Sequence, residues 1–327
     1  METRSDKTTG AQVANEPPAT LTISLVICTR NRAAQMGVAF ESLLTLPDQD
    51  SFELVIVNNG STDDTEAVIE SYRSRFSHFV SVFEPVAGLG RARNRGWRAA
   101  SGDIIAFTDD DCYPAKDHLK SICLCFEEDD QIGFVGGRIL LYDETDYRIT
   151  IQERSTRRVI KPGAFISAGF IQGANLACRR VALEEVGGFD VLFGHGAQFP
   201  CEDVDVQARI SAHGWRGLYD PRPLVYHHHG RKTHEEAMSL MKQYDRGRGA
   251  YYAKCILNSK LRSTYAKRWI KKILRQPFQR TWRELLAGGE YIGRLIFTKS
   301  TRPTADSAMA GPDQVVQTIN REDYPNS

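Results

Sequence analysis

A short apolar run that ends in three consecutive carboxylates is the feature that most constrains this chain. Residues 104–108 have the length and β-branched content of a buried strand, and Asp109, Asp110 and Asp111 follow directly. Carboxylates this close repel one another unless a counter-charge neutralises them. Mg²⁺ or Mn²⁺ binds oxygen ligands of this kind, and ligands of open α/β sheets bind beyond the carboxyl ends of strands. The run therefore predicts a metal-assisted site, with a solvated acidic turn as the alternative.

The chain before this run predicts further buried strands joined by helices. Residues 21–28, 52–57 and 79–83 are short apolar segments rich in β-branched and aromatic side chains. Helical patterns at 33–46 and from about 61 to 76 separate them. This alternation predicts an α/β fold with a parallel sheet and right-handed crossovers.

A segment rich in glycine and arginine, residues 87–96, lies just before the strand of the acidic triplet. Its glycines lack the full spacing of a dinucleotide-binding loop, so that motif is weak evidence. The stronger feature is Arg91, Arg93 and Arg95 at the start of a predicted helix, where an anion is favoured. The segment predicts contact with a phosphate, with a solvated basic helix face as the alternative.

Two polar motifs mark the second half of the chain. Glu202 and Asp203 open a predicted helix, where acidic residues also stabilise the helix dipole, so a structural role is the alternative to catalysis. His227, His228 and His229 follow an apolar strand, and three adjacent histidines favour a metal or a phosphate.

The segments around these motifs have less regular patterns. Residues 142–168 show no clean period and predict a mobile loop or an irregular ribbon. Residues 215–219 and 224–226 predict two strands, and Asp220 and Pro221 predict a turn between them.

The charge distribution distinguishes residues 231–300 from the rest. The net charge of the chain is +1, yet this segment holds 17 Lys and Arg against 5 Asp and Glu, an excess of 12 positive charges. Residues 234–258 and 261–275 predict helices. The second places five cations beside Trp269 and Ile270, a pattern typical of helices that lie on an anionic membrane surface. A solvated basic face is the alternative.

The termini and the cysteines bear on where the protein works. Residues 1–20 are polar and lack the apolar core of a secretory signal, and residues 301–327 are also polar, so both segments predict disorder. The sequence has no run of about 18 apolar residues, the length that spans a bilayer. Seven cysteines, an odd number spread along the chain, favour a reducing compartment over a disulfide framework. We expect a cytoplasmic protein.

Seven motifs together resemble the conserved blocks of family 2 glycosyltransferases with a GT-A fold. They occur in the family's order as VICTRNR, VNNGSTDD, GLGRARNRG, FTDDDC, GAN, GGFD and EDVDVQAR. The resemblance covers about residues 21–230. It implies a mostly parallel, Rossmann-like α/β sheet flanked by helices, with a donor half at about 21–112 and an acceptor half at about 113–230. Residues 231–300 would then be a basic helical extension.

The resemblance also implies roles for individual residues. Donor binding is implied for Thr29, Arg30, Arg32, Asn58, Arg93, Asn94, Asp109 and Asp110. Binding of Mn²⁺ or Mg²⁺ is implied for Asp109, Asp111, His227 and His229, with the choice among the three adjacent histidines left open. Acceptor contact is implied for Gly173, Ala174, Asn175 and Glu202. Asp203 corresponds to the catalytic base, with Glu202 beside it.

Asn58 stands where the family usually has an aspartate that contacts the base. An asparagine carbonyl can still accept a hydrogen bond from N3–H of uracil or thymine, whereas a carboxylate would suit the paired donors of guanine better. The substitution therefore favours a UDP or dTDP donor over GDP.

The implied activity is metal-dependent transfer of a sugar from a nucleotide diphosphate to a hydroxyl group. Loss of a diphosphate needs its charge neutralised, and attack by a hydroxyl needs a base. One base without a second nucleophilic carboxylate implies inversion. We expect a glycan or lipid-linked acceptor, peripheral contact with the cytoplasmic face of an anionic inner membrane, and no nucleic acid partner.

Two other functions are compatible with an α/β nucleotide-binding fold. A sugar nucleotidyltransferase would carry a glycine-rich loop directly after the first strand, and residues 29–37 have a glycine only at their end. A non-catalytic nucleotide-sugar-binding protein would have a damaged acidic triplet or no base, and both are intact in this sequence.

Overall fold

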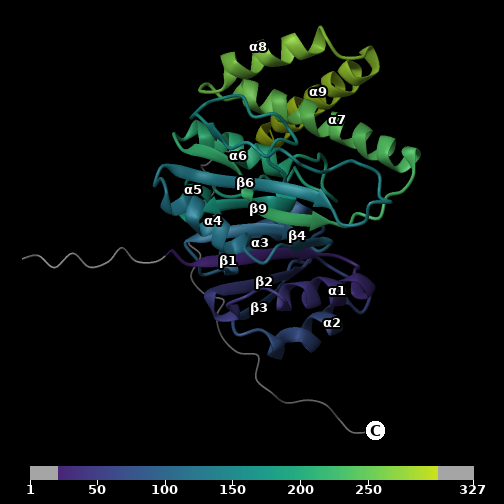
Figure 1. Cartoon of the computed structure of the whole chain (residues 1–327). Coiled ribbons are helices and arrows are strands. Elements are labelled where there is room, and N and C mark those ends of the chain that lie inside the picture. Colours follow the sequence, from purple (N-terminus) through teal and green to yellow (C-terminus); the bar gives the residue numbers. More distant parts are fainter. Residues whose placement is uncertain (1–20, 301–327) are drawn as a thin grey trace, which may run out of the picture.

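The computed structural model describes residues 21–300, so the predicted disorder at 1–20 and 301–327 lies outside the described part. A single sheet carries helices on both faces, and three further helices lie beyond one end of it (Figure 1). The strand order is β3-β2-β1-β4-β8-β6-β9-β5, with β7 paired to β9. The predicted α/β class is confirmed.

The first half contains the parallel strands that the sequence predicts. These are β1 (Ile23–Thr29), β2 (Phe52–Asn58), β3 (Phe79–Phe83) and β4 (Ile104–Asp109). The connecting helices are α1 (Ala33–Leu44), α2 (Thr65–Tyr72) and α3 (Leu89–Ala99), with short 3₁₀ turns at Gln49–Ser51 and Arg73–Arg75. Since β1 and β4 are direct neighbours, Thr29 and Asp109 end at the same edge of the sheet.

The second half of the chain adds antiparallel strands to the sheet. Its strands are β5 (Cys112–Pro114), β6 (Ile132–Leu141), β7 (Arg158–Ile160), β8 (Leu176–Arg179) and β9 (Arg216–His227). Strand β8 runs antiparallel to both β4 and β6, whereas β6 and β9 are parallel. The helices are α4 (His118–Glu127), α5 (Arg180–Glu185) and α6 (Glu202–Ala212), and a 3₁₀ turn covers Gly173–Asn175.

The predicted turn at Asp220 and Pro221 is wrong, because β9 continues through these residues. The register between β6 and β9 shifts there, so that Gly136 pairs with Tyr219 and Arg138 with Leu224. The intervening residues of β9 bulge over Gly137, where the Pro223 carbonyl lies too close to leave room for a Cβ atom. A bulge accommodates Pro221 and Pro223 without ending the strand.

Residues 142–168 form an ordered ribbon across the second half of the sheet. Strand β7 pairs antiparallel with β9, and an isolated bridge joins Gln152 to Ile139 of β6. The predicted irregular ribbon therefore describes this segment better than the alternative of a mobile loop.

The basic extension contains three helices, of which the sequence predicts the first two. Helix α7 (His234–Leu257) begins with a capping box between Thr233 and Glu236, and α8 (Arg262–Ile273) and α9 (Phe278–Ser300) follow. Helix α7 packs against both α8 and α9. One cluster of buried side chains extends from Val26 of β1 to Tyr251 of α7, so the extension shares a core with the sheet.

The length and hydrophobicity of the described helices show whether any of them could span a bilayer. No helix within residues 21–300 is both long enough and apolar enough to cross a membrane.

Helix α3 packs so closely on the sheet that Gly96 has no room for a side chain. A Cβ atom added there would overlap Val26 and approach Val57 Cγ2 to 2.9 Å. We expect Gly96→Ala to lower the free energy of unfolding by about 1–3 kcal/mol, the usual cost of overpacking a core. Urea denaturation measures this change.

Gly289→Ala is the matched control, because a Cβ atom added to this exposed residue of α9 meets nothing within 4 Å. Alanine favours the helix over glycine, so this change should raise the stability by up to about 1 kcal/mol. Equal effects of the two substitutions would contradict the close packing of α3.

Candidate active site

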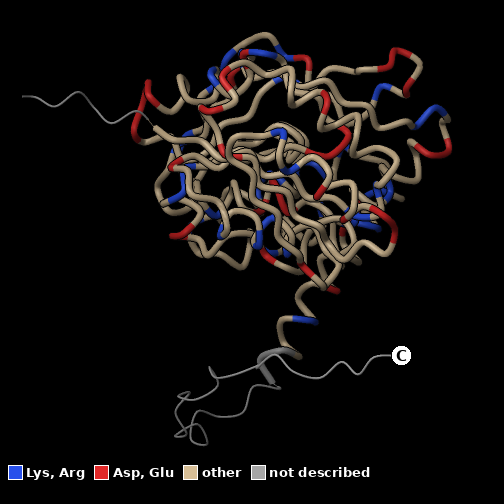
Figure 2. Tube along the Cα trace, turned by 90° about the horizontal axis from the view of Figure 1, so that it is seen from below, with Lys and Arg blue, Asp and Glu red and all other residues tan. Residues whose placement is uncertain are grey.

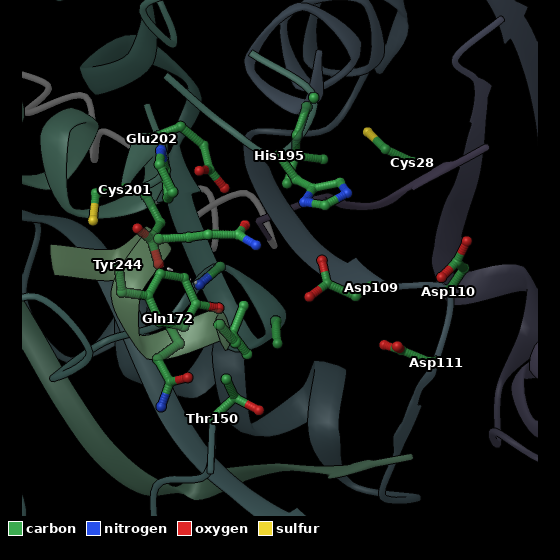
Figure 3. A pocket seen from close by; sticks show the side chains of 18 of the residues that line it. Cys28, Asp109, Asp110, Asp111, Thr150, Gln172, His195, Cys201, Glu202 and Tyr244 are labelled. Atoms are coloured by element: carbon green, nitrogen blue, oxygen red, sulfur yellow. Dashed lines mark hydrogen bonds between the residues drawn. The ribbon is translucent and has the colours of Figure 1, made fainter. Parts of the chain in front are cut away.

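A cavity of about 720 Å³ opens at the carboxyl ends of β1 and β4. Its walls come from the residues after these strands, the start of α3, the 3₁₀ turn at Gly173–Asn175, the start of α6 and one face of α7. In Figure 3 the three aspartates lie together on one side of the cavity, and Glu202 and Tyr244 lie on the other side. The candidate residues from both halves of the sequence thus meet in one place.

The three carboxylates of the acidic triplet have different partners. Asp109 accepts a hydrogen bond from Arg93 Nη2 at 3.2 Å, and its side chain stays partly exposed to the cavity. Asp110 turns inward and accepts a hydrogen bond from Thr29 Oγ1 at 2.6 Å. Burial raises the pKa of Asp110 to about 6. The mutual repulsion expected from the sequence is therefore reduced by separate environments.

Asp111 lies against His227, whose Nε2 is 3.4 Å from Asp111 Oδ1. Burial acts to raise the pKa of Asp111, but the hydrogen bond from His227 and its charge hold that pKa below its usual value. The same contact holds the pKa of His227 above its usual value, although burial opposes this. Arg32 adds positive charge, with Nη2 3.9 Å from Asp111 Oδ2.

Asp111, Cys112 and His227 bring one possible ligand atom each to within 4.8 Å of the others. Burial raises the pKa of the Cys112 thiol well above its usual value, so sulfur stays protonated and is a poor ligand. Carboxylate oxygens suit Mn²⁺ or Mg²⁺, and the imidazole nitrogen adds one further donor for a divalent ion. The residues present therefore fit a divalent cation.

The three adjacent histidines face different surroundings. His228 lies against Tyr113 and Tyr142, with its Nδ1 3.5 Å from the Tyr113 hydroxyl. His229 Nε2 is 3.0 Å from the Tyr147 carbonyl oxygen, and its Nδ1 accepts a hydrogen bond from the Arg231 backbone. Both ring nitrogens of His229 thus have partners within the chain, and the geometry favours His227 as the histidine ligand.

Arg93 is a buried guanidinium that joins the two sides of the cavity. Its Nη1 donates to Glu202 Oε1 at 2.7 Å, while Nη2 reaches Asp109. Its cationic group also faces the rings of Phe107 and Phe189, each centroid 5.7 Å away. A Cβ atom at position 173 would lie 2.5 Å from both terminal nitrogens, so this arrangement requires Gly173.

The predicted base and its neighbour occupy the start of α6. Asp203 Oδ2 accepts a hydrogen bond from the Gly173 backbone at 2.8 Å, and Oδ1 accepts one from Val204. Burial raises the pKa of Asp203, with Arg93 opposing. Burial likewise raises the pKa of Glu202 to about 7, against the opposing charge of Arg93. A carboxylate with a raised pKa is a stronger base, so the site can take up a proton near neutral pH.

Most of the predicted site residues line the cavity. They are Thr29, Arg30, Arg32, Arg93, Asp109, Asp110, Asp111, Gly173, Ala174, Glu202, Asp203 and His227. Motifs that lie far apart in the sequence thus contribute side chains to one cavity.

Three asparagines of the predicted site do not line the cavity, and their side chains form hydrogen bonds within the protein instead. Asn58 donates to Glu66 at 2.5 Å and accepts from the Ser61 backbone. Asn94 bonds to both backbone groups of Phe189. Asn175 donates to the carbonyl oxygens of Arg138 in β6 and Pro223 in β9. The preference for UDP or dTDP over GDP that was argued from Asn58 stays a prediction, and its neighbour Asn59 lines the cavity.

The sequence patterns did not indicate several other residues of the cavity wall. The charged and polar ones include Thr150, Gln172, His195, Arg231, Gln243, Tyr244 and Arg248. Burial raises the pKa of the Tyr244 hydroxyl, and the nearby Asp203 acts in the same direction. Arg231 stands two residues after His229, and that proximity is the signal that could have identified it. No local pattern distinguishes the face of α7 that meets the cavity.

Residues 24–187 match the family model for Glycosyl transferase family 2. The pre-mycofactocin glycosyltransferase of Mycobacterium tuberculosis is 27% identical over 216 residues, which cover 63% of this chain and 43% of that protein. A glycosyltransferase of Nostoc sp. is 31% identical over 178 residues, covering 51% and 54%. The chain thus spans about half the length of these curated relatives.

Two solved structures share the fold. TarS of Staphylococcus aureus (residues 1–349), in complex with UDP-GlcNAc, has a TM-score of 0.59 and 16% identity, covering 83% of this chain and 81% of that chain. A mannosyltransferase of Pyrobaculum calidifontis, in complex with GDP-Man and Mn²⁺, has a TM-score of 0.56 and 16% identity, covering 87% and 84%. These two structures show the fold, and the family model, which matches half of the chain, shows that the chain belongs to glycosyl transferase family 2.

Proposed function

We propose that this chain is an inverting, metal-dependent glycosyltransferase that moves a sugar from a nucleotide diphosphate sugar to a hydroxyl group of a glycan or lipid-linked acceptor. The observation that carries the proposal is the one cavity that is lined both by the adjoining Asp111 and His227 and by the carboxylate of Asp203. One side can hold the leaving group and the other can activate the acceptor.

The donor side of the cavity is rich in groups that attract a diphosphate. Arg30, Arg32 and Arg231 line it together with the acidic triplet. Asp109, Asp111 and His227 would hold Mn²⁺ or Mg²⁺, which neutralises charge on the diphosphate when bound. The neighbouring structures contain UDP-GlcNAc in one case and GDP-Man with Mn²⁺ in the other. A donor screen therefore has to include UDP-, dTDP- and GDP-sugars.

The catalytic step follows from the first two carboxylates of α6, Glu202 and Asp203. Asp203 takes the proton of the acceptor hydroxyl while the hydroxyl oxygen forms a bond to the anomeric carbon, and the bond from that carbon to the diphosphate oxygen breaks. Glu202 is 2.7 Å from Arg93 Nη1, which commits it to an ion pair and makes it a poor nucleophile. A single displacement then inverts the anomeric configuration.

The acceptor side is formed in part by α7. Leu240, Met241 and Tyr244 add apolar and aromatic surface opposite Gly173 and Ala174. Aromatic and apolar faces suit a sugar ring or a lipid-linked glycan, while Gln172 and Gln243 offer polar atoms for hydroxyl groups.

Asp111→Ala tests the metal site. We expect the gain in UDP affinity that Mn²⁺ provides to fall by roughly tenfold or more, because the change removes a ligand. Calorimetry with UDP in the presence of Mn²⁺ or of a chelator measures the gain. Asp130→Ala, an exposed carboxylate, is the control and should retain it. An unchanged dependence on Mn²⁺ in Asp111→Ala would remove this residue from the metal site.

Asp203→Asn tests the base. The side chain keeps its size but loses its basicity, so UDP should still bind while the rate of transfer falls by roughly 10²-fold or more. Release of nucleoside diphosphate from a panel of UDP-, dTDP- and GDP-sugars with glycan and lipid-linked acceptors measures the rate. Transfer at the wild-type rate would leave Asp203 with only its structural contacts to Gly173 and Val204.

Arg93→Met tests the buried ion pairs. We expect the free energy of unfolding at pH 7 to fall by about 3–5 kcal/mol, because Asp109 and Glu202 lose their counter-charge. A raised carboxyl pKa stabilises the fold below the unfolded pKa, and this stabilisation is lost as the pH rises through the folded pKa. The deficit should therefore shrink as the pH falls from about 7 toward 4.5, where Glu202 is protonated.

Urea denaturation across this pH range measures the deficit. Arg95→Met, an exposed arginine on the same helix, is the control and should change stability by less than about 0.5 kcal/mol. A deficit that stays constant with pH would show that Glu202 does not titrate in response to Arg93.

A further inference from the structure

A second, smaller cavity of about 360 Å³ lies between α8 and the start of α9, away from the active site. Its lining contains five cations and no carboxylate. The cations are Arg268, Lys271, Lys272, Arg275 and Arg280, and the other lining residues are Phe165 and Gln276. We call it the basic pocket. Five like charges around one cavity repel one another and favour an anionic ligand.

Most of the basic pocket's cations lack the ion pairs that other cations of the extension form. Arg246 pairs with Glu290 at 2.8 Å, and Lys254 pairs with Asp190 at 2.7 Å. Within residues 21–300, no ion pair is formed by Arg268, Lys271, Lys272 or Arg275. Arg280 does pair, with Asp245 and Glu284. The positive excess of the sequence is thus concentrated on α8 once the paired cations are set aside.

An exposed apolar stripe begins beside the basic pocket and continues along α9. Its members are more than half exposed, namely Ile270, Leu274, Phe278, Trp282, Leu286 and Ile296. On α9 they recur at helical spacing, while Glu284, Ala287 and Tyr291 on the other face are buried. The last turns of α9 project from the compact body of the protein (Figure 2). A continuous apolar face of this extent marks a surface that meets another apolar phase.

Trp269, which the sequence placed on the membrane side, faces the protein interior instead. Its ring packs on Tyr252 with centroids 5.8 Å apart, and its Nε1 donates to Glu284 Oε2 at 3.0 Å. Lys272 also turns inward, and its Nζ donates to the Tyr252 hydroxyl at 3.0 Å. The exposed aromatic residues that replace Trp269 in this role are Phe278 and Trp282, whose rings stack.

We propose that α8 and α9 form a docking surface for an anionic lipid bilayer. The basic pocket receives phosphate groups of lipid heads, and the apolar stripe enters the boundary between head groups and acyl chains, as in interfacial helices. The combination of unpaired cations with an adjoining apolar stripe is what a membrane surface requires. A second copy of this chain fits less well, because docking through the same surface would bring two basic pockets together.

The proposal goes beyond the transfer reaction and is tested without donor or acceptor. A failure of the membrane proposal can therefore be distinguished from a failure of the proposed transfer reaction. The full chain is mixed with vesicles of phosphatidylcholine alone, or of phosphatidylcholine with phosphatidylglycerol, and centrifuged at low and at high salt. We expect it to pellet with the anionic vesicles at low salt, and much less with neutral vesicles or at high salt.

Two pairs of substitutions separate the two parts of the surface. Lys271→Glu with Arg275→Glu should weaken binding by at least about twenty-five-fold, since each cation near an anionic leaflet contributes about a fivefold gain. Phe278→Ser with Trp282→Ser should weaken binding to the same vesicles at high and low salt alike. Lys120→Glu with Leu124→Ser, the same kinds of change on exposed residues of α4, is the matched control and should bind as wild type does.

Each result supports or overturns the proposal. Wild-type protein that stays in the supernatant with anionic vesicles overturns it, as does binding that survives both pairs of substitutions on α8 and α9. Circular dichroism confirms that each variant is folded. Light scattering of the protein alone reports the alternative occupant, and a dimer dissolved by Phe278→Ser with Trp282→Ser would assign the stripe to a second copy.

Discussion

The contact on which this active site depends is the buried guanidinium of Arg93 between Asp109 and Glu202. The two carboxylates come from opposite halves of the chain, and each would destabilise the fold if it were buried alone. Arg93 neutralises both, and its own burial is compensated by these ion pairs and by the faces of Phe107 and Phe189. The requirement for glycine at position 173 follows from the space that this side chain occupies.

The parts of the fold that depend on local patterns were predictable. The run of residues 104–108 is strand β4, and the acidic triplet stands at its carboxyl end beside Thr29, because adjacent parallel strands end at one edge. The ion pairs of Arg93 with Asp109 and with Glu202 were not predicted. No spacing in the sequence shows that residues 93 and 202 meet.

The differences between the sequence predictions and the structure have physical reasons of their own. An asparagine beside a ligand loop satisfies a backbone as readily as a substrate, and Asn58, Asn94 and Asn175 all satisfy backbone or side-chain groups of the protein. Trp269 looked like a membrane anchor because cations surround it in sequence, but a tertiary contact with Tyr252 decides which face of α8 is inside. The bulge at Pro223 depends on a glycine in another strand.

Helix α7 belongs at once to the wall of the active site and to the support of the outer helices. It is 24 residues long, or roughly 36 Å at the usual rise, and it packs against α9 while Leu240 and Tyr244 line the cavity. Gly249 permits the closest approach, since a Cβ atom there would overlap the Glu284 carbonyl. Because packed helices move as rigid units, any displacement of α9 would be carried through α7 to the side chains that it contributes to the cavity wall.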